Sequence, residues 1–139
     1  MAETIQEKAR RAFEAARGKF RFSNVEYSKA IEMTNLTILV CKGKIGALIG
    51  KGGAIVKEMG KEIGSRVRIV EHTKDEKKLV SDIAGNAKVL GINEVFAPEG
   101  RSIRIFLKEQ DRQKLIAPVE ELERALVELL GYGAKIEFQ

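Results

Sequence analysis

The sequence repeats itself once. When it is shifted by 67 residues without a gap, the apolar positions of its two halves coincide, and apolar spacings of four and of two recur in the same order. The matched pairs include Leu36 with Ile103, Ile38 with Ile105, Val40 with Leu107, Ile55 with Leu122, Met59 with Leu126, Ile63 with Leu130, and Gly64 with Gly131. A chain of 139 residues therefore holds two small units, which we expect at residues 1–71 and 72–139.

Each half predicts the element order α-β-β-α-α-β. In the first half, Thr4 and Glu7 form a capping-box pattern, and we expect the helix that follows to stop at Gly18. In the second half, the first helix should open within 73–76 and end at Gly85. The pattern predicts the α+β class, with one three-stranded sheet in each unit and helices packed on one face of it. The strands are expected over 22–32, 35–41 and 67–70, and over 88–97, 102–108 and 134–138.

Charge is divided unevenly between the halves. The chain has 25 Lys and Arg against 20 Asp and Glu, a net charge of +5. Residues 1–70 carry 14 basic and seven acidic side chains, a net +7, whereas residues 91–139 carry seven basic and nine acidic, a net −2. A polyanion is therefore the partner that we expect for the first half.

Composition narrows the class of protein further. No apolar run approaches the ~18 residues of a membrane-spanning helix, and the longest extends from Leu36 to Cys41. The single cysteine, Cys41, permits no internal disulfide, and no metal-ligand spacing occurs. We expect a cytoplasmic protein that contacts no membrane and uses no metal, cofactor or small-molecule substrate.

A glycine-rich segment between two predicted helices carries the strongest functional signal. Gly50, Lys51, Gly52 and Gly53, here called the glycine loop, let the backbone turn sharply and leave few side chains to hold a ligand away. The unpaired amides at the start of the next helix attract phosphate, and Lys51 adds a full positive charge. A Walker loop is excluded because Gly52, and not Ser or Thr, follows the lysine, and a dinucleotide fingerprint is excluded because Ile55 stands where it needs glycine.

The segment I-G-K-G-G-A-I-V at residues 49–56 resembles the signature of the KH domain. The order α-β-β-α-α-β resembles the type II form of that domain, and the tandem arrangement resembles the small archaeal NusA-like transcription factors, which consist of two KH domains. The resemblance implies a protein of two type II KH domains in tandem. It further implies that single-stranded RNA lies in a groove, with its backbone bound by the loop and about four bases read beside it.

Carried onto this chain, the resemblance assigns RNA contacts to three groups of residues. The glycine loop binds the RNA backbone. Two isoleucines flank it, and of these Ile55 continues a helical stripe that indicates packing. Four basic side chains then offer contacts to phosphates. The candidate RNA-binding residues are Gly50, Lys51, Gly52, Gly53, Ile49, Ile55, Lys44, Lys57, Arg66 and Arg68.

The second unit departs from this pattern. Ala117, Pro118, Val119 and Glu120 stand where the repeat places the glycine loop, and two more glutamates follow within the next three residues. Proline and carboxylates suit a helix start, but they obstruct and repel a phosphate. We interpret the second unit as a scaffold or as a surface for a protein partner.

Other functions were weighed against RNA binding. The only histidine, His72, lies between the units and has no partner in the pattern, so we expect no enzyme. The leading hypothesis is a monomeric, NusA-like factor that binds nascent RNA in transcription termination, antitermination or elongation, and its partners would be single-stranded RNA and RNA polymerase. The alternatives are an adaptor with two KH domains in ribosomal RNA maturation, and a module that binds a polymerase or ribosome with residual RNA binding.

Overall fold

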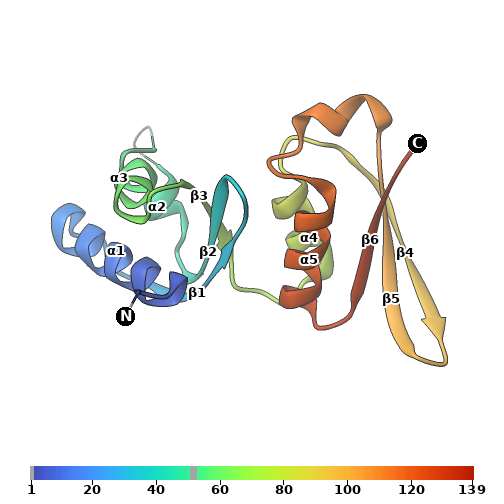
Figure 1. The fold of residues 1–139 in the computed structure, drawn as a ribbon, viewed down its shortest axis with the longest axis horizontal. Helices are drawn as coiled ribbons and strands as arrows, with labels where there is room; N and C mark the ends of the chain where they lie inside the picture. The colour runs from blue at the N-terminus through green and yellow to red at the C-terminus, as the bar shows by residue number, and fades with distance from the viewer. Residues whose placement is uncertain (1, 51–52) are drawn as a thin grey trace. The chain divides into compact units, whose positions relative to one another are not determined.

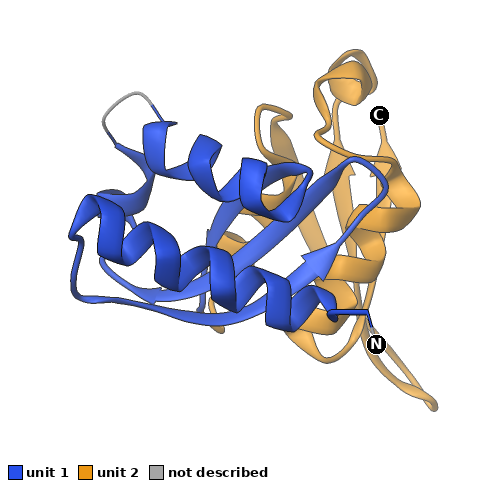
Figure 2. Ribbon diagram, turned by 60° about the vertical axis from the view of Figure 1, so that its left-hand side comes forward, with its two compact units in different colours: residues 1–72 blue, residues 73–139 orange. Residues whose placement is uncertain are grey.

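The computed structural model describes residues 2–50 and 53–139, and the chain divides after His72 into two compact units (Figure 2). Unit 1 spans residues 1–72 and unit 2 spans residues 73–139. The elements of unit 1 are α1 (Ile5–Phe20), β1 (Val25–Glu32), β2 (Leu36–Gly43), α2 (Gly46–Ile49), α3 (Ala54–Ile63) and β3 (Arg66–Glu71). Those of unit 2 are α4 (Glu76–Ala84), β4 (Val89–Ala97), β5 (Gly100–Leu107), the 3₁₀ helix η2 (Glu109–Lys114), α5 (Val119–Leu130) and β6 (Gly133–Phe138).

Each unit contains one three-stranded sheet, labelled in Figure 1. In unit 1 the order is β1-β2-β3, with β1 antiparallel and β3 parallel to the central strand β2. Unit 2 repeats this arrangement with β4, β5 and β6. A parallel neighbour requires a crossover connection, and α2 with α3 supplies it in unit 1. The predicted α+β class with two three-stranded sheets is confirmed.

The core of unit 1 lies between its sheet and two helices. Figure 2 shows α1 and α3 side by side over one face of the sheet, and the two helices contact each other. Phe13 of α1 is fully buried and meets Phe22 edge to face, with ring centroids 5.4 Å apart. The predicted helical stripe of Ile55, Met59 and Ile63 is buried in the same cluster. Each such side chain stabilises the fold by about 1.5–3 kcal/mol on burial.

Both first helices have the expected kind of start, although one begins later than predicted. At α1 the capping box is confirmed: the Glu7 amide donates to Thr4 Oγ1 over 3.1 Å, and the Glu7 side chain accepts from the Thr4 amide. At α4 the cap is Asp75, whose Oδ1 accepts from the Lys78 amide over 3.2 Å. Thr73 lies outside the helix and accepts from the Asp75 amide. In each case the side chain satisfies an amide that the helix leaves unpaired.

The predicted stop of α1 at Gly18 is wrong. The helix continues to Phe20 and ends at Arg21, whose backbone is left-handed with φ 54°. Glycine in a helix costs about 1 kcal/mol relative to alanine. The two extra residues bring Phe20, which is partly buried, against the core cluster, and this contact offsets part of the cost. The predicted stop at Gly85 is confirmed, and α3 and α5 end at the matched glycines Gly64 and Gly131.

Equivalent residues of the central strands β2 and β5 are 66 residues apart in the chain, one fewer than the shift of 67 in the sequence repeat. In unit 1, Leu39 lies in the core beneath α1 and α3 and pairs with Ile69 of β3. In unit 2, Ile105 is buried and pairs with Ile136 of β6. Ile69 and Ile136 are 67 residues apart, but Leu39 and Ile105 are 66 apart. The predicted match of Ile38 with Ile105 is therefore wrong, because one step along a strand exchanges the faces of the sheet.

Among the helices of the described residues, none is long and apolar enough to cross a lipid bilayer.

Candidate nucleic-acid interface

The approach to the glycine loop is fixed by a close backbone contact at the end of β2. Gly43 has φ +100°, and a Cβ there would lie 2.1 Å from the carbonyl oxygen of Asn24. The amide of Lys44 donates to that same oxygen over 2.9 Å. Only glycine permits this approach. The contact joins the end of β2 to the residue before β1 and directs the chain into α2.

The short helix α2 separates a buried side chain from an exposed one. Leu48 is fully buried, whereas the neighbouring Ile49 is 50% exposed just before the glycine loop. Exposure of a large aliphatic side chain is informative where a binding surface is expected. Ile49 is therefore an exposed apolar side chain directly before the glycine loop.

The described ends of the glycine loop lead directly into α3. The Gly50 amide donates to Gly46 O over 3.1 Å, and the Gly53 amide donates to Gly50 O over 3.3 Å. Gly53 is the N-cap of α3, is left-handed with φ 75° and provides no side-chain cap. The first amides of the ten-residue helix α3 therefore receive no bond from a capping side chain. Lys51 and Gly52 lie outside the described residues.

Two predicted contacts on α3 have different surroundings. Ile55 is only 4% exposed and belongs to the core cluster, so its role is packing. Lys57 is exposed one turn after the start of the helix. Of the two, Lys57 is the side chain that a ligand at the loop can reach.

Arg66 and Arg68 lie at the other end of the sheet. In the register of β2 and β3, Arg66 pairs with Leu36 and Arg68 pairs with Ile38. Ile38 is six residues before Lys44, or about 20 Å at 3.3 Å per residue. The structure therefore does not bring these two arginines together with Lys44 in one basic cluster.

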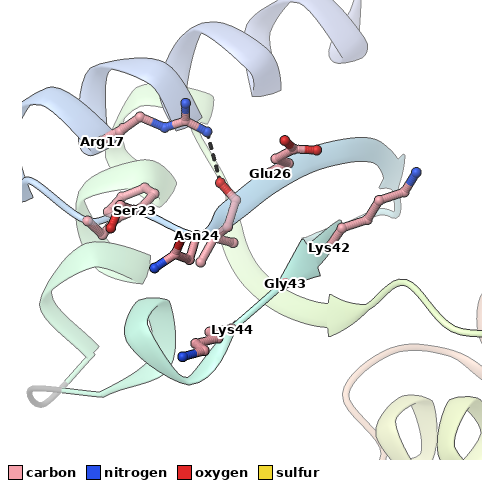
Figure 3. Close-up of a pocket in the computed structure, with 9 residues that line it drawn as sticks. Arg17, Ser23, Asn24, Glu26, Lys42, Gly43 and Lys44 are labelled. Atoms are coloured by element: carbon pink, nitrogen blue, oxygen red, sulfur yellow. Dashed lines mark hydrogen bonds between the residues drawn. The ribbon is translucent and has the colours of Figure 1, made fainter.

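A pocket beside α2 gathers basic side chains instead. Figure 3 shows Arg17 on α1, Lys42 at the end of β2 and Lys44 in the turn before α2, with Lys42 and Lys44 on opposite sides of Gly43. The pocket has a volume of about 650 Å³ and is also lined by Phe22, Ser23, Asn24, Val25 and Glu26. We call it the basic pocket. Of these three, only Lys44 is among the ten candidate RNA-binding residues predicted from the sequence.

For Lys42 and Arg17 the sequence contains only a partial signal. Lys42 and Lys44 flank a glycine, which marks a surface turn with two cations. Arg17 is 25 residues before Lys42, and only the fold brings α1 beside the end of β2. Its Nη2 donates to Val25 O over 2.9 Å, and its guanidinium lies 5.1 Å from the ring centre of Phe13. These contacts hold the cation at the pocket.

Unit 2 has a different connection at the place of the glycine loop. Pro118 is the N-cap of α5, and Glu120 and Glu121 stand in its first turn. Carboxylates at a helix N-terminus interact favourably with the helix dipole. The same negative charges would repel a phosphate at this place. Glu123 Oε2 accepts from the Ile136 amide over 2.8 Å and joins α5 to β6. The connection into α5 therefore carries a proline and carboxylates where unit 1 has glycines.

Cys41 and His72 are the single cysteine and the single histidine of the chain. Cys41 is buried in the core, and desolvation raises the pKa of its thiol to about 12, so it is not a nucleophile at neutral pH. His72 is exposed at the end of unit 1. Within residues 2–50 and 53–139, no group of three or more His, Cys, Asp or Glu side chains is placed to hold a metal ion.

Comparisons with known proteins agree with this site. Residues 35–87 match the family model of the KH domain, from just before β2 to just after α4. The matched segment includes the glycine loop. No curated protein matches the chain. A solved structure titled "Crystal structure of APE1850" is 20% identical, covers 97% of this chain and 100% of its own, and superposes with a TM-score of 0.72. That likeness shows a shared fold over nearly the whole chain.

Proposed function

We propose that this protein binds single-stranded RNA through the glycine loop of unit 1. A KH domain at residues 35–87 supports RNA binding in general. The observation that carries the proposal is the arrangement within that domain: a left-handed Gly53 opens α3 without a side-chain cap, beside the half-exposed Ile49. Backbone amides and an apolar side chain adjacent to one another suit an RNA phosphate and its base.

We further propose that unit 2 is a second type II KH domain that has lost this site. Its strand order and its parallel and antiparallel pairs equal those of unit 1. Its glutamates at the start of α5 disfavour a phosphate. In this proposal unit 2 stiffens the protein or contacts RNA polymerase, and the protein acts in the cytoplasm as a NusA-like monomer on nascent RNA without catalysing a reaction.

The experiment that tests RNA binding reverses the charge of the loop. Lys51→Asp with Gly52→Asp places two carboxylates where the phosphate should bind, and we expect affinity for single-stranded RNA to fall by about 100-fold. The matched control is Pro118→Asp with Val119→Asp in unit 2, which should change affinity less than about twofold. Fluorescence anisotropy with labelled RNA measures both, and circular dichroism checks the fold. Unchanged affinity of a folded loop variant would reject the proposal.

The transcriptional role needs a separate experiment. The intact protein and the loop variant are added to a purified transcription system, and the lengths of the transcripts are compared. A NusA-like factor should alter pausing or termination, and the loop variant should not. No effect of the intact protein, with RNA binding retained, would favour the alternative role in ribosomal RNA maturation.

A further inference from the structure

The basic pocket has a net positive lining. The lining contains three basic side chains, those of Arg17, Lys42 and Lys44, and one acidic side chain, that of Glu26. The net charge of the lining is therefore +2. Arg17 pairs with Glu14 at the long distance of 3.8 Å, and Glu26 is the cross-strand partner of Lys42 in the register of β1 and β2. A volume of about 650 Å³ is within the range of ligand pockets in proteins.

Arg17 retains unused donor capacity. Its Nη2 bond to Val25 O fixes the side chain, but a guanidinium has five N–H donors. Its Nε is buried and has no hydrogen-bond partner in the described part of the chain. Because the buried Nε is out of reach of a ligand, the donors left for phosphate oxygens are those of Nη1 and the second N–H of Nη2.

The basic pocket is close to the glycine loop along the chain. Lys44 lies at the pocket, and Gly50 begins the loop six residues later, after α2. The four residues of α2 between them rise by about 6 Å at 1.5 Å per residue. An RNA strand bound at the loop can therefore continue into the pocket within a few nucleotides.

Unit 2 supplies an internal comparison. A cavity of about 530 Å³ lies at the corresponding end of its sheet, beside the start of β4 and the end of β5. It is lined by Leu90, Lys108, Glu109, Gln110 and Gln139, so its charged side chains cancel. Glu109 also pairs with Arg112 over 2.9 Å. At this end of the sheet the cavity of unit 2 has a neutral lining, whereas the basic pocket of unit 1 has a positive one.

We propose that the basic pocket is an additional RNA subsite, which holds phosphates of the strand that continues beyond the glycine loop. The inference rests on the proposed RNA binding and extends it, because it assigns Arg17 and Lys42 to the interface and lengthens the bound strand. Arg17 forms paired hydrogen bonds to a phosphate, and Lys42 and Lys44 neutralise its neighbours. The result is a site longer than the about four nucleotides that a KH domain binds.

The test separates the two sites by RNA length. Affinity is measured for a single-stranded RNA of about four nucleotides, and for the same RNA extended by about four nucleotides at its 5′ end or at its 3′ end. One extension should improve the affinity of the intact protein by about tenfold, since it adds phosphate contacts. Lys42→Glu and Arg17→Gln should each remove most of that gain and leave the affinity for the short RNA within about twofold. The matched control is Lys108→Glu at the cavity of unit 2, which should keep the gain.

Each outcome decides a different claim. If the intact protein fails to bind the short RNA, the proposed site at the glycine loop is wrong. If the short RNA binds but neither extension improves affinity, the subsite does not exist. If Lys42→Glu weakens short and extended RNA equally, or Lys108→Glu removes the gain as well, the added affinity is general charge attraction and the inference is overturned. Lys42 is exposed, so Lys42→Glu tests the claim even if Arg17→Gln disturbs α1.

Discussion

Units 1 and 2 use one strand order to present two different surfaces. In unit 1 the parallel crossover passes through glycines, and Gly53 opens α3 without a side-chain cap. In unit 2 the crossover passes through Pro118 into a helix whose first turn carries Glu120 and Glu121. Both connections close the same three-stranded sheet. The fold therefore does not determine the sign of the charge at the crossover connection. Function depends on the residues that the connection carries.

The same contrast exists at the end of each sheet that precedes the crossover. In unit 1 a backbone carbonyl, Asn24 O, accepts from the Lys44 amide, and the side chains around it are basic. In unit 2 a carboxylate, Asp111 Oδ2, accepts from the Lys88 amide over 2.9 Å. The side chains of Lys44 and Lys88 are both exposed, but only the joint of unit 2 buries a carboxylate, that of Asp111. The two joints therefore satisfy the same kind of amide with a backbone oxygen in unit 1 and with a side-chain oxygen in unit 2.

The largest effect should come from the joint of unit 1. Gly43→Val would force a side chain against Asn24 O and a strained φ, and we expect unit 1 to lose about 3 kcal/mol or more. Cys41 is the only cysteine and is buried in unit 1, so its alkylation reports opening of that unit. The reaction should be slow in the intact protein and much faster in the variant.

A glycine of unit 2 provides the control for that substitution. Gly131 also has a positive φ, 86°, but no atom lies within 4 Å of a Cβ placed there. Gly131→Ala should cost about 1 kcal/mol and leave Cys41 unreactive. Equal alkylation of Cys41 in both variants would show that the close approach at Gly43 is unimportant.

The joint of unit 2 should respond to pH. The Lys88 amide is the main cause that lowers the pKa of Asp111, and Lys114 adds to it. A lowered pKa in the folded state means stability that is present above the unfolded value of about 3.9 and is lost as pH falls through the folded pKa. Asp111→Asn should therefore destabilise unit 2 at neutral pH, and its difference from the intact protein should close in acid. Denaturant unfolding at a series of pH values measures this, and a difference that is constant with pH would contradict it.

The smallest effects should come from the two helix caps. Thr4→Ala at α1 and Asp75→Ala at α4 each remove the side chain that accepts a first-turn amide, at a cost of about 1 kcal/mol. Amide hydrogen exchange, resolved by residue, should show each loss mainly in its own unit. A loss below about 0.3 kcal/mol in both variants would mean that water replaces these caps without penalty.

The sequence predicted what depends on neighbours along the chain. The capping box at Thr4, the glycine stops and the apolar stripe on α3 are local patterns, and the structure confirms them. Gly18 was misjudged because the burial of Phe20, a tertiary contact, decides where α1 ends. Local propensity is a weak guide where packing opposes it.

Two features could not be predicted because they depend on contacts between distant segments. Every residue from Leu36 to Cys41 is buried, so the apolar pattern of β2 does not tell which alternate residues face α1 and α3. The pairing of Leu39 with Ile69 decides it. Arg17 and Lys42 likewise line one pocket only because the fold places α1 beside the start of β1 and the end of β2. The 67-residue repeat of apolar positions therefore predicts neither the face of β2 that meets the helices nor the place of Arg17 beside Lys42.

A crosslinking map of the intact protein tests the contrast between the units most directly. RNA containing 4-thiouridine is bound, irradiated and digested, and the crosslinked peptides are identified by mass spectrometry. RNA binding by unit 1 predicts crosslinks on the segment from Lys42 to Lys57, which includes the glycine loop, and none on the segment from Leu115 to Glu123 of unit 2. Crosslinks of equal yield on both segments, or only on unit 2, would contradict the account.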